Sequence, residues 1–299
     1  MNAGSGGRLA ATSLSKINLV LGIEGLLPDG RHELATWFQA IDYGDGIEVE
    51  PCDDLVLLCD LPDLCPMEEN LAWRAAKALQ AAAGVRSGAL IRLSKSVPHG
   101  AGLGGGSGDA AMVLRLCDRL WGLRSTLETL EDVGRSLGAD VPFLVRGGAA
   151  WAVGAGDILE PAPGLHPDVE ILVATPAVAV NTGWAYRTWD EFHLAGLPER
   201  APRTTLPSLR SRAFFRSEDL RGHLFNDFEG VVFDRFPEIA RVREEMGCAG
   251  AAASLLSGSG SSVFGLFEGR TAPGAILREW ERRGIRWRWC RPAEGLPQT

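Results

Sequence analysis

A glycine-rich stretch, GAGLGGGSGD at residues 100–109, stands between an alternating segment and a helical one. A loop that joins a strand to a helix presents free backbone N–H groups and the positive end of the helix dipole to an anion. Glycines let phosphate oxygens approach the backbone closely and adopt φ values that other residues resist. The stretch therefore predicts a phosphate-binding loop, and a flexible or tightly packed turn is the alternative.

Three common phosphate-binding patterns do not match this loop. A Rossmann fingerprint lies early in a βαβ unit, with an acidic residue about 20 positions later, whereas this loop begins a third of the way along the chain with no clear partner acid. A Walker A loop ends in GK[ST], and no lysine follows these glycines. The HRD and DFG motifs of protein kinases are also missing from the sequence. A phosphate loop of a different fold remains.

Lysine is rare in this chain. Of the 30 basic residues only Lys16, Lys77 and Lys95 are lysines. Where arginine is otherwise preferred, a retained lysine can mark a position that needs a compact ammonium charge. Lys77 belongs to the solvated face of a predicted helix. Lys16 and Lys95 flank the informative motifs, and Lys95 is a candidate charge partner for phosphates at the glycine loop.

Strands and turns are predicted to dominate the first fifty residues. In KINLVLGI at 16–23 the apolar side chains alternate with Lys16, Asn18 and Val20, which predicts a strand whose second face carries polar groups. PDG at 28–30 predicts a turn, and DG at 45–46 predicts a second turn that we interpret as a hairpin.

Helices are predicted on both sides of the glycine loop. Apolar residues at helical spacing predict helices over 68–84 and 107–121. A further helix is expected to end at Gly138, with Asp140 just after it. We expect extended backbone at Asp140 because Val-Pro follows, and extended structure over FLVRGGAAWAVG at 143–154.

A proline-rich stretch, EPAPGLHPD at 160–168, is the predicted domain boundary. It divides the chain into residues 1–161 and 162–299. Strand and helix patterns follow in mixed order beyond it, including a serine and glycine loop at 257–262. The sequence therefore predicts two α+β domains.

Several motifs resemble those of the GHMP kinases, a family of small-molecule kinases with a central loop of the form PxxxGLGSS. PHGAGLGGGSGDAA at 98–111 fits this loop, and LSGSGSSVFGLF at 256–267 resembles the family's C-terminal glycine motif. Four more motifs resemble the members that phosphorylate 4-diphosphocytidyl-2-C-methyl-D-erythritol: SKINLVL at 15–21, DGRHEL at 29–34, LGADVPFLVRGGAAWAVGAGDIL at 137–159 and NDFE at 226–229. The matches run in order over most of the chain.

This resemblance implies a two-domain α+β fold with a ferredoxin-like C-terminal domain and an active site in the cleft between the domains. It also implies an enzyme that uses ATP and Mg²⁺ to phosphorylate the 2-hydroxyl of that substrate, in non-mevalonate isoprenoid precursor synthesis. Phosphoryl transfer requires positioning, charge stabilisation and usually a carboxylate near the attacking hydroxyl.

The family's functional residues map onto positions of this sequence. The resemblance makes Lys16 the residue that stabilises the transferring group and the developing alkoxide, and Asp140 the base or electrostatic anchor. It implies adenine binding near Asn70, a contact from Ser107 to Mg²⁺, and Lys95 beside the nucleotide. The implied phosphate loop comprises Pro98, Gly100, Gly102, Leu103, Gly104, Gly105, Gly106 and Ser107, and the implied substrate contacts are Asn18, Arg31, His32, Asp140 and Thr182.

Two positions depart from the family pattern. Arg31 stands where the family usually has a tyrosine that stacks on cytosine, although a guanidinium plane can also stack on a base. Gly108 stands where the family usually has a second serine. Two alternatives therefore stay open: a GHMP kinase for another alcohol, of mevalonate or homoserine type, and a non-catalytic ligand sensor with this fold.

Composition limits the remaining possibilities. A formal net charge of −8 argues against a nucleic-acid-binding protein. No apolar run approaches the length of about 18 to 20 residues that spans a bilayer, and the N-terminus lacks the apolar core of a signal peptide, so we expect a cytoplasmic protein. The six cysteines and five histidines show no metal-ligand spacing. The oligomeric state is left open.

Overall fold

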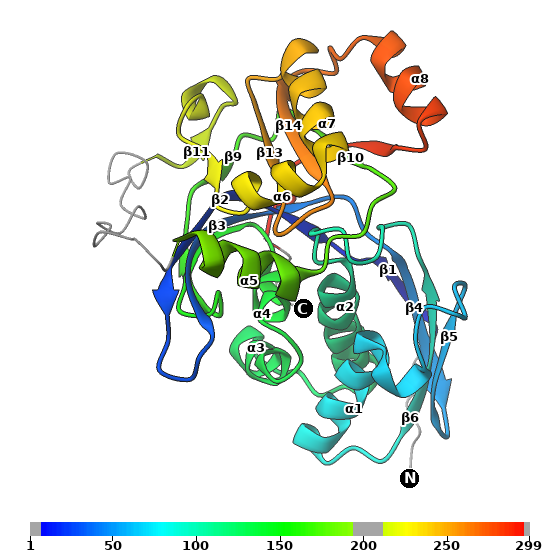
Figure 1. Cartoon of the computed structure of the whole chain (residues 1–299). Coiled ribbons are helices and arrows are strands. Elements are labelled where there is room, and N and C mark those ends of the chain that lie inside the picture. The colour runs from blue at the N-terminus through cyan, green and yellow to red at the C-terminus, as the bar shows by residue number, and fades with distance from the viewer. Residues whose placement is uncertain (1–6, 194–211, 296–299) are drawn as a thin grey trace.

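The computed structural model describes residues 7–193 and 212–295, and its larger elements form three sheets with helices around them (Figure 1). The central sheet has the strand order β12-β2-β3-β7-β8. Its strands are β2 (Ser15–Leu26), β3 (His32–Ile41), β7 (Ala149–Val153), β8 (Ile158–Pro161) and β12 (Phe225–Asn226). The strand and the turn predicted at 16–23 and 28–30 are confirmed, because β2 and β3 form an antiparallel hairpin around that turn.

A second sheet and four helices complete the first half of the fold. The strand order is β1-β4-β6-β5, and helices α1 and α2 pack against this sheet. The strands are β1 (Leu9–Thr12), β4 (Gly46–Cys52), β5 (Leu55–Cys59) and β6 (Gly88–Ser94). The helices are α1 (Leu71–Ala83), α2 (Gly105–Leu120), α3 (Leu127–Arg135) and α4 (Asp140–Arg146), with a short 3₁₀ turn, Met67–Glu69, before α1.

The hairpin predicted at residues 45–46 is wrong. β3 and β4 belong to different sheets, and β4 pairs with β1 and β6 instead. The carboxylate of Asp45 is buried and accepts hydrogen bonds from the backbone N–H groups of Ser96, at 2.5 Å, and Val97, at 2.8 Å. The DG dipeptide therefore carries the chain from one sheet to the next and holds the segment before the glycine loop.

The extended conformation predicted at Asp140 is also wrong. Asp140 is the first residue of α4, and FLVR continues that helix to Arg146. Pro142 occupies the third helical position, where the missing N–H leaves no hydrogen bond unmade. A proline so early in a helix is tolerated, so the Val-Pro pair does not extend the backbone at Asp140.

The second half contains the ferredoxin-like arrangement that the resemblance implies. Four antiparallel strands have the order β13-β14-β10-β15, and helices follow β10 and β14 in the chain, which is the β-α-β-β-α-β pattern. The strands are β10 (Val169–Thr175), β13 (Ala253–Leu256), β14 (Val263–Glu268) and β15 (Arg286–Cys290). The helices are α5 (Thr182–His193), α6 (Glu229–Arg235), α7 (Pro237–Cys248) and α8 (Gly274–Arg282). Shorter elements are β9 (Gly164–Leu165), β11 (Phe214–Phe215) and a 3₁₀ turn, Glu218–Leu220.

The two halves share structure. β12, from the second half, pairs in parallel with β2 of the first, so that Phe225 lies opposite Val20 and Asn226 opposite Leu21. One buried apolar cluster also contains side chains of β2 and β3 together with side chains of β10 and β14. The boundary at residue 161 stays a prediction. In the described ranges no helix has both the length and the apolar character needed to cross a bilayer.

Steric contact explains why position 108 is a glycine in this chain. Gly108 is buried in the first turn of α2, and a Cβ there would lie 1.8 Å from the carbonyl oxygen of Leu14, just before β2. In this chain, therefore, the serine usual in the family would push α2 away from the start of β2.

Gly102→Ala is expected to destabilise the fold more than Gly100→Ala. Both glycines have positive φ, +78° and +64°, so both variants incur the left-handed backbone cost of about 1–2 kcal/mol. A Cβ on Gly102 would also lie 2.0 Å from the carbonyl oxygen of Ser257, whereas one on Gly100 meets no atom within 4 Å. Urea unfolding should therefore show about 1–3 kcal/mol of additional loss for Gly102→Ala. Equal losses would contradict the tight contact between the two loops.

Candidate active site

A pocket of about 280 Å³ lies where β2, β3, the N-termini of α2 and α4, α5 and the 257–262 loop meet. The lining includes many of the residues predicted from the sequence: Lys16, Asn18, Gly102, Gly104, Ser107, Asp140 and Thr182. Its other lining residues are Leu21, Leu34, Thr36, Phe38, Ala139, Ala155, Gly156, Tyr186, Phe228, Gly258 and Ser259. The fold thus gathers the predicted lysine, aspartate and glycine loop around one cavity.

The Lys16 ammonium group is buried in this pocket. Its Nζ donates to Asn18 Oδ1 at 2.6 Å and lies 3.9 Å from Asp140 Oδ2 and 5.4 Å from the centre of the Phe38 ring. Burial lowers the pKa of Lys16 from its ordinary value of 10.5, and the charge of Asp140 opposes that shift. At 3.9 Å the carboxylate only partly compensates the ammonium, which keeps the capacity to bind a further anion.

Gly104 brings the N-terminus of α2 close to the Lys16–Asp140 pair. It is the N-cap of α2, with φ of +67°, and a Cβ there would lie 3.2 Å from Lys16 Cγ and 3.4 Å from Asp140 Oδ2. A side chain would therefore crowd both groups. With glycine, an ammonium, a carboxylate and the positive end of a helix face the same cavity.

The amide of Asn18 has a defined orientation. Thr36 Oγ1 donates to the carbonyl oxygen of Val20 at 2.6 Å, so it accepts from Asn18 Nδ2 at 2.8 Å. Asn18 Oδ1 must then face Lys16, and it also accepts from the N–H of Gly258 at 3.0 Å. Asn18 thereby links β2 to the second glycine loop, residues 257–262.

The two glycine loops contact each other directly. Ser257 Oγ donates to the carbonyl oxygen of Gly102 at 3.0 Å, and the N–H of Ser262 donates to that of Ala101 at 3.1 Å. From the side of α5, Thr182 Oγ1 and Ser259 Oγ are 2.8 Å apart. These contacts close one side of the pocket.

His32 and Arg31 lie outside the residues that line this cavity. His32 Nε2 is 2.8 Å from Asp190 Oδ1, and its ring stacks on Tyr186, with centroids 4.2 Å apart. Arg31 is exposed on the β2–β3 turn and donates to Asp29 Oδ2 at 2.8 Å. Tyr186 therefore lines the cavity together with Phe38 and Phe228, and His32 stacks on Tyr186 from outside the lining.

Asn70 serves as a helix cap. Its Oδ1 accepts from the N–H of Ala72 at 3.0 Å at the start of α1. Leu71, the next residue, lies near the glycine loop, 3.6 Å from the position that a Cβ on Gly106 would take. A role of Asn70 at the adenine stays a prediction.

Lys95 is held by two buried carboxylates of the protein itself. Its Nζ lies 2.5 Å from Asp45 Oδ2 and 2.7 Å from Asp109 Oδ2, and 4% of its side chain is exposed. Burial of the second carboxylate in this cluster raises the pKa of Asp109 to about 7, with Lys95 opposing that shift. The Lys95 ammonium is thus already compensated and is not among the residues that line the cavity.

Sequence reasoning did not single out several of the lining residues, among them Tyr186, Thr36 and Phe228. Tyr186 is one of only two tyrosines in the chain, and the scarcity argument applied to lysine would have singled it out. Burial raises the pKa of Tyr186 to about 12, so its phenol stays protonated. Thr36 follows an ordinary strand pattern and gave no signal, whereas Phe228 belongs to the NDFE motif at 226–229.

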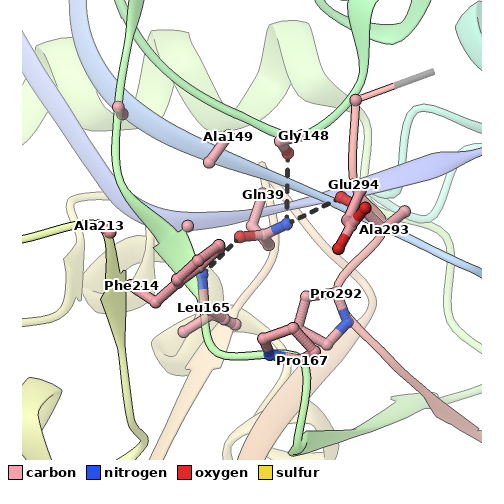
Figure 2. Close-up of a pocket in the computed structure, with 13 residues that line it drawn as sticks. Gln39, Gly148, Ala149, Leu165, Pro167, Ala213, Phe214, Pro292, Ala293 and Glu294 are labelled. Carbon is pink, nitrogen blue, oxygen red and sulfur yellow. Dashed lines mark hydrogen bonds between the residues drawn. The ribbon is translucent and has the colours of Figure 1, made fainter. Parts of the chain in front are cut away.

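A second pocket, of about 460 Å³, is larger but chemically poorer (Figure 2). It surrounds Gln39, whose amide is already bonded to backbone: Nε2 donates to the carbonyl oxygens of Gly148 and Ala293, and Oε1 accepts from the N–H of Leu165. Glu294 is the one charged side chain among its described lining residues, and none of the predicted site residues is there. The candidate active site is therefore the smaller pocket.

Comparison with known proteins shows the family of this chain. Residues 70–148 match the family described as "GHMP kinases N terminal domain" and residues 209–286 match "GHMP kinases C terminal". A curated relative from Chlorobium limicola, named 4-diphosphocytidyl-2-C-methyl-D-erythritol kinase, is 39% identical over 93% of this chain and 95% of its own. The chain belongs to the GHMP kinase family.

Two solved structures resemble the fold of this GHMP kinase. A crystal structure of 4-(cytidine 5'-diphospho)-2C-methyl-D-erythritol kinase is 34% identical, with a TM-score of 0.74, and the match covers 95% of this chain and 100% of that one. A crystal structure of mevalonate kinase has a TM-score of 0.72 at 14% identity, covering 96% and 99%, and shows the shared fold alone.

Lys16 and Lys95 are expected to titrate on opposite sides of the ordinary lysine pKa of 10.5. In NMR spectra of protein labelled with ¹³Cε-lysine, Lys16 should titrate below its ordinary pKa of 10.5 because burial disfavours the ammonium, and Lys95 above 10.5 because Asp109 and Asp45 favour it. The Lys16 ammonium is then present below its lowered pKa and is lost as pH rises through it. Lys77→Arg removes one signal and assists assignment. Coincident titrations of Lys16 and Lys95 would contradict these environments.

Proposed function

We propose that this GHMP kinase transfers the γ-phosphate of ATP to the 2-hydroxyl of 4-diphosphocytidyl-2-C-methyl-D-erythritol. The observation that carries the proposal is the convergence of Lys16, Asp140 and the N-terminus of α2 on one cavity. The printed names of the Chlorobium relative and of the 34% identical crystal structure support this substrate.

Lys16 and Asp140 have different roles at the acceptor hydroxyl. Asp140 orients the hydroxyl and accepts its proton or anchors it electrostatically, while the Lys16 ammonium stabilises charge on the transferring phosphoryl group and the developing alkoxide. Both groups are preorganised before substrate arrives, since Asn18 and Gly104 fix their surroundings.

The first turn of α2 supplies the phosphate cradle. Gly104, Gly105, Gly106 and Ser107 open the helix, and their N–H groups and the helix dipole favour phosphate oxygens. For Mg²⁺, Ser107 and Asp140 line the same pocket and offer the oxygen donors that this ion prefers. When bound with ATP, the ion would neutralise charge on the phosphates.

An aromatic wall on the side of α5 suits a flat base. Tyr186 is stacked on His32 and also packs edge-on against Phe228, at 4.8 Å and 80°. We assign the cytosine to this wall, with Thr182 and Asn18 toward the sugar and methylerythritol parts. Arg31, the residue before His32, is exposed and stands where the family usually has a tyrosine. This departure supports the alternative of another alcohol substrate.

Lys16→Met and Asp140→Asn are each expected to lower kcat by about 10³-fold or more, because each removes a charge that acts on the transferring group. ADP release coupled to a dye, with 4-diphosphocytidyl-2-C-methyl-D-erythritol as acceptor, measures this. Lys77→Met, which removes an exposed lysine far from the pocket, is the control and should keep parental kcat. Parental turnover by Asp140→Asn would remove Asp140 from the chemistry, and turnover of mevalonate or homoserine alone would replace the substrate.

Tyr186→Ala is expected to raise KM for the cytidine substrate about 10-fold or more with little change in KM for ATP, since base stacking on an aromatic ring contributes about 1–3 kcal/mol. Tyr186→Phe keeps the ring and should stay close to the parent. If both variants raise KM equally, the phenol hydroxyl and not the ring face carries recognition.

A further inference from the structure

Asn226 does not line the pocket, but its side chain makes three hydrogen bonds to the backbone around it. It opens the NDFE segment and is 5% exposed. Its Nδ2 donates to the carbonyl oxygens of Leu256, at 2.9 Å, and Gly258, at 2.8 Å, and its Oδ1 accepts from the N–H of Phe228 at 2.9 Å. The side chain therefore fixes the start of the second glycine loop.

The rest of the segment ties this loop to the catalytic strand. The N–H of Asp227 donates to the carbonyl oxygen of Leu21 at 2.9 Å, and its Oδ2 accepts from the N–H of Ile23 at 3.0 Å. On the other side, Glu229 Oε1 accepts from the N–H of Leu256 at 2.9 Å. Residues 226–229 therefore set the spacing between β2 and the end of β13.

Gly258 connects this spacing to Lys16 through the two peptide groups on either side of its Cα. Asn226 Nδ2 donates to the Gly258 carbonyl oxygen, and the Gly258 N–H donates to Asn18 Oδ1 at 3.0 Å. The same Asn18 oxygen accepts from Lys16 Nζ at 2.6 Å. Because Thr36 fixes the other end of the Asn18 amide, the Gly258 N–H determines where the oxygen that faces Lys16 lies.

We propose that Asn226 is a positioning residue for phosphoryl transfer, which holds the backbone of Gly258 so that Asn18 aims the Lys16 ammonium into the pocket. The proposal rests on the function assigned to Lys16 above. In a preorganised site, a displacement of about 1 Å costs about 10²-fold in rate. Loss of the amide should therefore be expressed in kcat and not in the binding of ATP.

Asn226→Ala is expected to lower kcat by about 10- to 100-fold while KM for ATP stays within about threefold of the parent. Asn226→Asp keeps the acceptor for Phe228 but removes both donated hydrogen bonds, so it should be slowed to a similar extent. Ser217→Ala is the matched control: Ser217 is fully buried in the same half and donates to Glu268 Oε1 at 2.7 Å, away from the loop. It should lower Tm and leave kcat unchanged.

Parental kcat in a folded Asn226→Ala or Asn226→Asp variant would overturn the proposal, as would an equal loss of kcat in Ser217→Ala. A double-mutant cycle sharpens the test, because residues that act through one path are not additive. Asn18→Ala combined with Asn226→Ala should be no more than about threefold slower than Asn18→Ala alone. Multiplicative losses would overturn the link through Asn18.

A readout that needs no turnover separates this proposal from the proposed substrate. With three lysines in the chain, ¹³Cε-lysine spectra at a fixed pH resolve Lys16 from Lys77 and Lys95. Asn226→Ala should shift the Lys16 signal and leave the other two in place, and Ser217→Ala should shift none. An unmoved Lys16 signal overturns the positioning role. If it moves but the parent does not phosphorylate the proposed acceptor, only the substrate assignment fails.

Discussion

The backbone contact between the two glycine loops is the constraint on which the site depends. Gly102 lies so close to the carbonyl of Ser257 that no side chain fits, and hydrogen bonds from Ser257 and Ser262 join the loops. The first loop leads into α2, and the second supplies the N–H that holds Asn18. Close packing at this one junction therefore fixes the start of α2 relative to β2, although the two loops are far apart in the sequence.

The two buried lysines differ in how far neighbouring carboxylates compensate their charge. Lys95 has two carboxylates within 2.7 Å, which compensate its charge and connect β6, the segment at Asp45 and α2. Lys16 has one carboxylate at 3.9 Å and a neutral amide at 2.6 Å. Burying an ammonium with so little compensation is costly, and a phosphate group entering the pocket would supply the missing charge. The burial of Lys16 thus lowers the stability of the fold at the place where the proposed function requires a phosphate to bind.

The two halves of the chain are coupled through the hydrogen bonds of the short strand β12 and the residue after it. β12 is two residues long, yet it places Asn226 and Asp227 between β2 and the loop after β13. Motion of one half against the other would have to break these hydrogen bonds. The pocket therefore has a hydrogen-bonded wall along β2 and the 257–262 loop, and Tyr186 of its aromatic wall comes from the separate helix α5.

Local pattern determined much of this protein. Alternation placed Lys16 and Asn18 on the polar face of β2, and glycine density placed a loop at the start of α2, because periodicity and turn chemistry act over a few residues. The order of strand and helix patterns predicted an α+β second half, and the family resemblance implied its ferredoxin-like arrangement. The tertiary structure decided the rest. It sent β4 into another sheet, began α4 at Asp140, paired Lys95 with Asp45 and Asp109, and placed Tyr186 and Asn226 around the pocket. Those outcomes depend on contacts between residues distant in sequence, whose partners no local pattern specifies.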